Sequence, residues 1–188
     1  MDKIPTLFLR NPENMKLVTH DINPDAAWLL TTYAMPTVKK DGTNIRVTLK
    51  DRKCIMVEKR RNPTREEKAQ GQEPGYVLAS RDDPADKHIF AAVDATDFSS
   101  FPFPAGGWPC EALGPKIQGG VESDTPCLYP FTVFPIVIEE EIPLTYEGIK
   151  AYLETHEIEG IVWHEQNGPR NAKIKRRDFG LAWPVKRK

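Results

Sequence analysis

The sequence has little that would indicate a membrane, secreted or zinc-binding protein. Its 188 residues include three cysteines and no C-x-x-C pair, so neither a disulfide framework nor a zinc site is indicated. No hydrophobic run approaches the roughly 18 residues that a membrane helix needs, and Met1–Pro5 lacks the apolar segment of a signal peptide. The formal net charge is only −1, so there is no global basic field. We therefore expect a cytoplasmic protein that does not bind a membrane.

Several common catalytic motifs are also missing. The sequence contains no G-x-S-x-G nucleophile elbow and no H-E-x-x-H zinc motif, and its four histidines are scattered. The segment Gly114–Gly120 has the glycines of a phosphate-binding loop. It lacks the Lys-Ser/Thr pair that contacts phosphate and magnesium, which excludes a P-loop.

The composition is that of one globular domain. The chain is 39% hydrophobic and 28% charged, and its length allows one domain with a real core, which we place over residues 1–188. Proline, at 17 residues, is nearly twice as frequent as the usual ~5%. Many prolines favour short strands and turns over a helical bundle, and the predicted pattern of mostly antiparallel strands with a few helices makes an α+β domain.

Apolar alternation predicts mostly antiparallel strands with a few helices. Thr37–Leu49 is interrupted by Asp41-Gly42, and Cys54–Arg60 follows as the second arm of a hairpin. Thr145 suits the N-cap of a helix over Tyr146–His156. The other expected elements are strands at Pro109–Leu113, Leu128–Ile138, Glu159–His164 and Asn171–Arg176, a short helix from Asn23-Pro24, and a mobile polar loop over Pro63–Gly75.

Charge is unevenly distributed along the chain. Arg170–Lys188 holds eight basic residues and one acid, whereas Glu139–Glu165 holds eight acids and one base. Either block could simply be a solvated face. Blocks that cancel in the total can still leave one locally positive surface, which is what a polyanion requires.

Lysines and glutamates stand at the ends of expected strands. Lys39-Lys40-Asp41-Gly42 has the form K-x-D-G after an apolar approach. Lys173 and Lys175 are two residues apart, so in a strand both side chains point to one face, where they bind phosphate or are exposed to solvent. Glu159 precedes an apolar strand, a suitable place for a metal ligand and also a common way for any strand to begin.

The order of these motifs resembles that of the covalent nucleotidyltransferase superfamily, which contains ATP-dependent polynucleotide ligases and RNA capping enzymes. Two strings, Glu111–Gly119 and Lys173–Gly180, look most like the RNA ligase branch. The successive matches are Lys39-Lys40-Asp41-Gly42, Glu58-Lys59-Arg60-Arg61, Cys110-Glu111-Ala112-Leu113-Gly114, Leu128–Phe134, Glu159-Gly160-Ile161-Val162 and Lys173-Ile174-Lys175, which span nearly the whole chain.

The resemblance implies a nucleotidyltransferase fold, the adenylation domain of ligases, with antiparallel sheets flanked by a few helices. It also implies an ATP-dependent RNA ligase with a role in RNA repair. A lysine attacks the α-phosphate of ATP to give lysyl-AMP, AMP passes to an RNA 5′-phosphate, and a 3′-hydroxyl displaces it. An ordinary lysine is deprotonated only about once in 2,500 molecules at pH 7, so neighbouring positive charge must activate it.

The same matching implies site residues. Lys39 is the nucleophile, with Lys40 pointing to the other face, and Glu159 positions Mg²⁺ or Mn²⁺. Lys173 and Lys175 contact the α-phosphate. The remaining implied contacts are Asp41 and Gly42 at the turn after the nucleophile, Asn44 in the pocket or in that turn, Arg60 (or Arg61) on nucleotide and phosphate, Glu111 on the ribose, and Phe131 (or Phe134) stacked on adenine or in the core.

The chain departs from many relatives in one respect. Only residues 176–188 follow Lys175, too few for the OB-fold domain that often comes after the last motif. We therefore expect RNA with 5′-phosphate and 3′-hydroxyl ends to be bound by a monomer, chiefly through its basic C-terminal stretch. The alternative docking groups are Lys3, Arg10 and Lys16, or Arg60, Arg61 and Arg65. The alternative functions are a minimal DNA ligase, another AMP-transferring enzyme, and a non-catalytic RNA-binding module.

Overall fold

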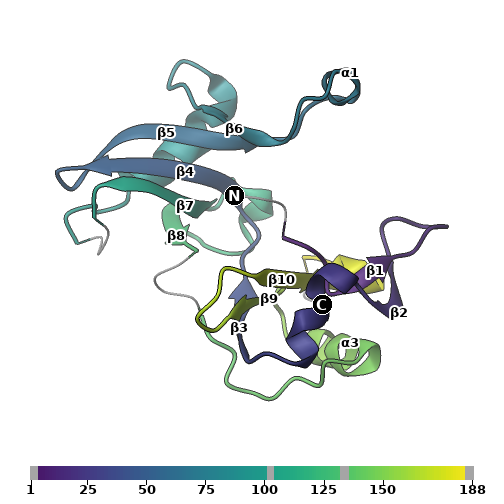
Figure 1. The fold of residues 1–188 in the computed structure, drawn as a ribbon. Coiled ribbons are helices and arrows are strands. Elements are labelled where there is room, and N and C mark those ends of the chain that lie inside the picture. The colour runs from purple at the N-terminus through teal and green to yellow at the C-terminus, as the bar shows by residue number, and fades with distance from the viewer. Residues whose placement is uncertain (1–3, 101–103, 132–135, 185–188) are drawn as a thin grey trace. The chain divides into compact units, whose positions relative to one another are not determined.

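The computed structural model describes residues 4–100, 104–131 and 136–184. The chain forms two compact units, each described here by itself (Figure 1). The first unit comprises Met1–Lys40 and Pro135–Lys188, and the second comprises Asp41–Phe134. That residues 1–188 act as a single nucleotidyltransferase domain stays a prediction.

The first unit is built on a three-stranded antiparallel sheet in the order β10-β9-β3. Its strands are β3 (Ala34–Lys39), β9 (Gly160–Glu165) and β10 (Asn171–Lys175). The other elements of this unit are the β1 (Phe8–Arg10) and β2 (Val18–Ile22) pair, the 3-10 helices η1 (Pro24–Leu30) and η4 (Arg176–Phe179), and the helix α3 (Tyr146–Thr155).

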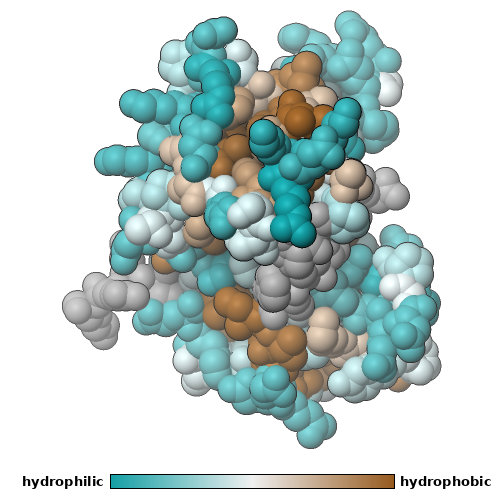
Figure 2. Space-filling model, turned by 90° about the vertical axis from the view of Figure 1, so that its left-hand side faces the viewer, coloured by the Kyte–Doolittle hydropathy of each residue, from teal (hydrophilic) through white to brown (hydrophobic). Residues whose placement is uncertain are grey.

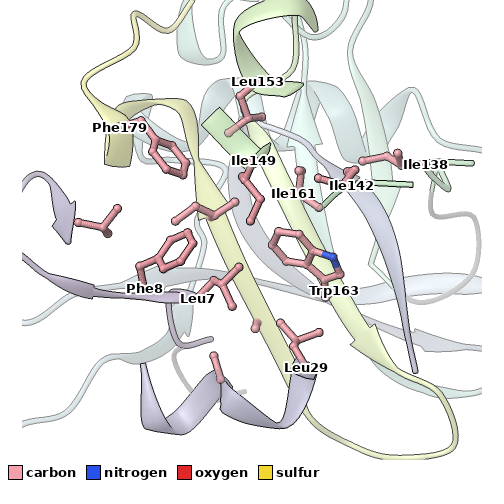
Figure 3. Packing of buried hydrophobic residues seen from close by; sticks show 14 of the residues in the cluster. Leu7, Phe8, Leu29, Ile138, Ile142, Ile149, Leu153, Ile161, Trp163 and Phe179 are labelled. Atoms are coloured by element: carbon pink, nitrogen blue, oxygen red, sulfur yellow. The ribbon is translucent and has the colours of Figure 1, made fainter. Parts of the chain in front are cut away.

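One face of this sheet carries the core of the first unit (Figure 3). Ile161 and Trp163 of β9 and Ile174 of β10 are buried there, because alternate residues of a strand point to the same face. Ile149 and Leu153 of α3 pack in the same cluster, together with the N-terminal Leu7 and Phe8. The opposite face of the sheet carries mainly polar side chains, with the half-buried Met35 and Val162 among them.

The second unit is a five-stranded antiparallel sheet in the order β6-β5-β4-β7-β8. The strands are β4 (Thr43–Lys50), β5 (Lys53–Arg61), β6 (Gly75–Leu78), β7 (Gly106–Leu113) and β8 (Cys127–Pro130). The helix α2 (Lys87–Asp94) buries its apolar side chains against Ile45, Val47, Cys110 and Ala112. The short elements are α1 (Arg65–Ala69), η2 (Pro84–Asp86) and η3 (Gln118–Gly120).

The expected α+β arrangement of antiparallel sheets with a few helices is confirmed. The hairpin of β4 and β5 is present, and the helix after Thr145 begins as predicted, with the Thr145 hydroxyl accepting from Gly148 N–H at 3.1 Å. Asn23 likewise caps η1 by accepting from Asp25 N–H. The interruption at Asp41-Gly42 is larger than expected, because β3 and β4 belong to different sheets.

Two predicted segments differ from the structure. The polar segment Pro63–Gly75, expected to be a mobile loop, contains the helix α1, because Thr64 and Glu67 form a capping box that satisfies backbone donors at its start. Within the described residues, the strand expected over Leu128–Ile138 ends at Pro130, and Val137 forms an isolated bridge with Thr37. Residues 132–135 of that segment lie outside the described residues.

Some large apolar side chains remain exposed, among them Met15 and Tyr33 in the first unit and Ile55 and Leu78 in the second. On the face drawn in Figure 2, brown apolar areas are interrupted by teal hydrophilic side chains. Within the described ranges, no helix combines the length and the apolar character needed to span a membrane.

Candidate functional site

The polar face of the three-stranded sheet carries three lysines. Lys39 at the end of β3 and Lys175 at the end of β10 both pair with Gly160 at the start of β9, one from each side. Lys173 lies two residues before Lys175, while the intervening Ile174 is fully buried. Paired residues of antiparallel strands project to the same face, so this sheet brings together the three lysines singled out from the sequence.

A buried carboxylate lies among these lysines. The side chain of Glu159 is 7% exposed, and its Oε2 forms an ion pair with Lys39 Nζ. Its other oxygen, Oε1, lies 3.7 Å from Lys175 Nζ. An adjacent carboxylate favours the charged form of an amine. In this arrangement Lys39 is therefore held as an ammonium, and it must leave Glu159 or lose its proton before it can act as a nucleophile.

Gly160 allows this close approach of the strands. A Cβ at this position would overlap the carbonyl oxygen of Ile174 and lie 2.9 Å from Cα of Lys175. Arg176 N–H also donates to the Glu159 carbonyl at 2.9 Å, which continues the β9–β10 pairing past the end of β10. The backbone of Glu159 is thus fixed from one side, and its side chain is aimed at the lysines.

Further along the same face, Thr37 and His164 add no positive charge. Thr37 is buried, its hydroxyl donates to the Val162 carbonyl at 3.1 Å, and its Oγ1 lies 3.0 Å from His164 Nε2. Burial lowers the pKa of His164, with a smaller opposing effect from its hydrogen bond to Asn171. The imidazole is therefore neutral at pH 7, and the positive charge of this face comes from its lysines.

Glu159 is suited to bind a divalent cation only if the cation is also bound by phosphate oxygens. Within the parts of the chain that the structure describes, no three His, Cys, Asp or Glu side chains cluster closely enough to hold a metal ion. Both oxygens of Glu159 face ammonium groups, which would repel a lone cation. Mg²⁺ commonly uses one or two carboxylates together with waters and substrate phosphates. The donor set therefore suits a cation that enters with a nucleotide.

The second unit aligns another group of the sequence-predicted residues. Asn44 of β4 pairs with Glu111 of β7, Glu111 pairs with Tyr129 of β8, and Arg60 of β5 pairs with Tyr76 of β6. The Tyr76 hydroxyl donates to Asn44 Oδ1 at 2.7 Å, which joins the two pairs into one row. This row crosses the five-stranded sheet on the face opposite the buried Ile45 and Cys110 strand positions.

Tyr76 is held between cations. The Arg46 guanidinium lies 4.6 Å from the centre of its ring, and Arg46 in turn makes a two-pronged ion pair with Glu58, at 2.6 and 2.7 Å. Burial raises the pKa of the Tyr76 hydroxyl, against the opposing effects of Arg60 and Arg46. The Arg46 ion pair lowers the pKa of Glu58, so that carboxylate is ionised at neutral pH.

The turn after Lys39 and Lys40 is tied to Glu111. Gly42 N–H donates to Glu111 Oε1 at 3.0 Å, and Asp41 N–H donates to Glu122 Oε1 at 3.1 Å. Glu111 itself is buried. Oε1 of Glu111 therefore fixes the start of β4. A ribose hydroxyl would have to bind the other carboxylate oxygen or replace Gly42 N–H at Oε1.

Gly42→Ala is expected to lower the free energy of unfolding by about 1–3 kcal/mol, the usual cost of overpacking a filled site. A Cβ here would overlap the Ala112 carbonyl oxygen and lie 2.6 Å from Glu111 Cγ. Urea unfolding measures the change. Gly75→Ala is the matched control, because a Cβ at that strand position meets nothing within 4 Å; equal midpoints for the two variants would contradict the packing described.

Of the two phenylalanines that are candidates to stack on adenine, the structure describes one. Phe131 lies one residue beyond the end of β8, where its N–H donates to the Pro109 carbonyl at 3.3 Å. Phe134 lies outside the described residues. Tyr129 and Tyr76, which the sequence reasoning did not single out, are the aromatics in the row with Glu111 and Arg60. Their positions depend on strand register, which no local motif reveals.

Three further residues or groups named from the sequence remain. The carbonyl of Lys40 accepts a hydrogen bond from Lys39 Nζ at 3.2 Å. Arg61, the alternative to Arg60, forms an ion pair with Glu67 of α1 at 2.7 Å. The last residues of the basic stretch, Lys186, Arg187 and Lys188, and the N-terminal Lys3 lie outside the described residues.

No family model and no curated protein matches the sequence. Among solved structures, the chain is similar to a Naegleria gruberi RNA ligase without ligand, at 14% identity, and to a Naegleria gruberi RNA ligase with AMP and Mn, at 15% identity. The TM-score is 0.45 in both comparisons. Each covers 92% of this chain but only 58% and 59% of the ligase chains, so the chain spans less than two thirds of their length.

Proposed function

We propose that the chain is an ATP-dependent RNA ligase with a nucleotidyltransferase fold that joins 5′-phosphate and 3′-hydroxyl ends through lysyl-AMP on Lys39. The observation that carries the proposal is the contact of Lys39 and Lys175 with one buried carboxylate, Glu159, at the ends of three neighbouring strands. The ordered motifs of the sequence support it. A binding module has no need of a lysine that lies beside two others and is paired with a buried acid.

The first step of the proposed reaction takes place at Lys39 Nζ. The neutral amine attacks the α-phosphorus of ATP, an N–P bond forms, the bond to the β-phosphate oxygen breaks, and pyrophosphate leaves. The excess proton on the nitrogen passes to solvent. Lys173 and Lys175 disfavour a third ammonium on their face and attract the phosphate, whereas Glu159 opposes proton loss for as long as it holds Lys39.

A divalent cation, Mg²⁺ or Mn²⁺, bound with the nucleotide would offset phosphate charge beside Glu159. In the second step an oxygen of the RNA 5′-phosphate attacks the phosphorus of the bound AMP, the N–P bond to Lys39 breaks, and the amine recovers a proton. In the third step a 3′-hydroxyl oxygen attacks the phosphorus of the activated 5′ end, the bond to AMP breaks, AMP leaves, and the hydroxyl proton passes to solvent. For the nucleotide itself, the proposal assigns contacts to Glu111, Asn44, Arg60 and the turn at Asp41-Gly42, with Phe131 as the adenine-stacking candidate.

Joining of labelled RNA tests the proposal. With ATP and either cation, a 5′-phosphorylated RNA is expected to become a longer, phosphatase-resistant strand, through a detectable adenylylated 5′ end. A chemically pre-adenylylated RNA is expected to join without ATP. RNA binding without product or adenylylated end would indicate a non-catalytic module, joining of DNA ends alone would indicate a DNA ligase, and AMP transfer to another acceptor would indicate a different transferase.

A further inference from the structure

A second feature of the first unit lies beside the lysine cluster and shares Lys175 with it. A groove of about 790 Å³ runs between the connection from β1 to β2 and the η4 segment that follows β10. Its volume is within the range of about 300–1,000 Å³ typical of ligand sites. Four cationic side chains line it: Arg10, Lys16, Lys175 and Arg177.

The acid that lines this groove is already neutralised. Asp178 is buried, with Oδ1 accepting from Arg10 Nη1 at 2.7 Å and Oδ2 accepting from Lys175 N–H at 2.8 Å. These bonds hold Arg10 and the backbone of Lys175 in place. Lys16 and Arg177 are exposed, so they offer positive charge to an incoming ligand.

The groove adjoins the lysine cluster through a shared residue. Lys175 lines the groove, and its Nζ also lies 3.7 Å from Glu159 Oε1. A ligand lying in the groove would therefore have one end beside Glu159 and Lys39. Among the described residues that line the groove none is aromatic. Its chemistry suits phosphates rather than stacked bases, since base recognition in single strands relies on aromatic platforms.

We propose that this groove binds the sugar-phosphate backbone of the RNA strand whose reacting end lies at Lys39. The identity of the strand rests on the proposed ligase function, whereas the polyanion binding rests on the groove itself. Because the contacts are to phosphates, binding is independent of base sequence and strongly dependent on salt. RNA docking by the first unit would thus use the N-terminal β1–β2 connection as well as the basic segment after β10.

The test compares single-residue variants in fluorescence anisotropy with a short 5′-phosphorylated single-stranded RNA. Lys16→Ala and Arg177→Ala are each expected to weaken binding about 3- to 10-fold at about 50 mM salt, and to reduce the slope of log affinity against log salt by about 0.7, the value for one phosphate contact on a single strand. Lys16→Arg is expected to restore both, since it keeps the charge.

Lys150→Ala is the matched control, because it removes one partly exposed positive charge from α3 of the same unit, away from the groove. Equal losses in Lys150→Ala and Lys16→Ala, or an unchanged salt slope in the groove variants, would overturn the proposal. Thermal unfolding of each variant checks that the fold is retained. Arg177 Nη2 donates to the Trp183 carbonyl, so Arg177→Ala loses this hydrogen bond; if that variant is unstable, the result for Lys16→Ala decides the test.

Formation of enzyme–AMP, measured on the same proteins, separates the two proposals. If the unmodified chain forms no AMP adduct and the groove variants still lose RNA affinity and salt slope, the ligase function is wrong and the groove stands. If the adduct forms and RNA binding is indifferent to Lys16 and Arg177, the groove is wrong and the ligase function stands.

Discussion

Replacing Lys39 with arginine is expected to abolish covalent AMP attachment. A guanidinium keeps the positive charge beside Glu159, so the buried carboxylate retains a partner. It remains protonated at every accessible pH, however, and cannot attack phosphorus. Radiolabelled ATP followed by denaturing electrophoresis measures the adduct, and we expect none above background.

Lys39→Ala is expected to give the same loss but is a less clean variant. It removes the ammonium that pairs with Oε2 of Glu159, whose side chain is 7% exposed, while Lys175 stays 3.7 Å from Oε1. Weakening the pairing of a buried acid costs about 1–3 kcal/mol of stability. Lys40→Ala is the neighbouring control and should label normally. Labelling of the Lys39→Arg protein, or loss of labelling only in Lys40→Ala, would show that the nucleophile has been assigned to the wrong lysine.

Glu159→Gln is expected to slow AMP attachment by at least about 100-fold while changing ATP affinity much less. The carboxylate is assigned to the cation, whose stabilisation of charge grows toward the transition state, and losses of such groups commonly cost 10²–10³ in rate. Removing the acid also frees Lys39 from an ion pair that favours its ammonium form, which acts in the opposite direction. We expect the loss of the cation site to dominate.

Single-turnover kinetics across a Mg²⁺ or Mn²⁺ titration measures this effect. Glu165→Gln is the control on the same strand, since Glu165 forms its ion pair with Arg170 instead of the lysine cluster, and its rate should stay within about threefold of the parent. A Glu159→Gln protein as fast as the parent at every cation concentration would remove Glu159 from the cation site. A faster one would mean that Glu159 acts only to restrain Lys39.

The parts of the site that could be predicted from sequence are those set by local periodicity. Lys173 and Lys175 share a face because a strand repeats every two residues, and the buried Ile174 between them fits that pattern. The caps at Thr145 and Asn23 depend on neighbouring residues alone and were equally predictable. These features need no knowledge of which strands pair.

The rest depends on pairing between distant segments. Lys39 meets Glu159 because β3 pairs with β9, more than a hundred residues later in the chain, and Lys175 comes close on the other side because Gly160 lets β10 approach β9. Tyr76 and Tyr129 join Glu111 only through the register of three strand pairs. The interruption of Thr37–Leu49 at Asp41-Gly42 was visible in the sequence, but not that the strands on its two sides belong to separate sheets, since alternation within a strand does not say which strands pair.

The central claim, that Lys39 becomes covalently joined to AMP, is tested most directly by intact-protein mass spectrometry after incubation with ATP and Mg²⁺ or Mn²⁺. We predict that the chain gains the mass of one AMP, that the gain maps to the peptide containing Lys39, and that added pyrophosphate removes it. A folded protein that binds ATP but shows no mass increase with either cation, or one that carries AMP on another residue, would contradict the account.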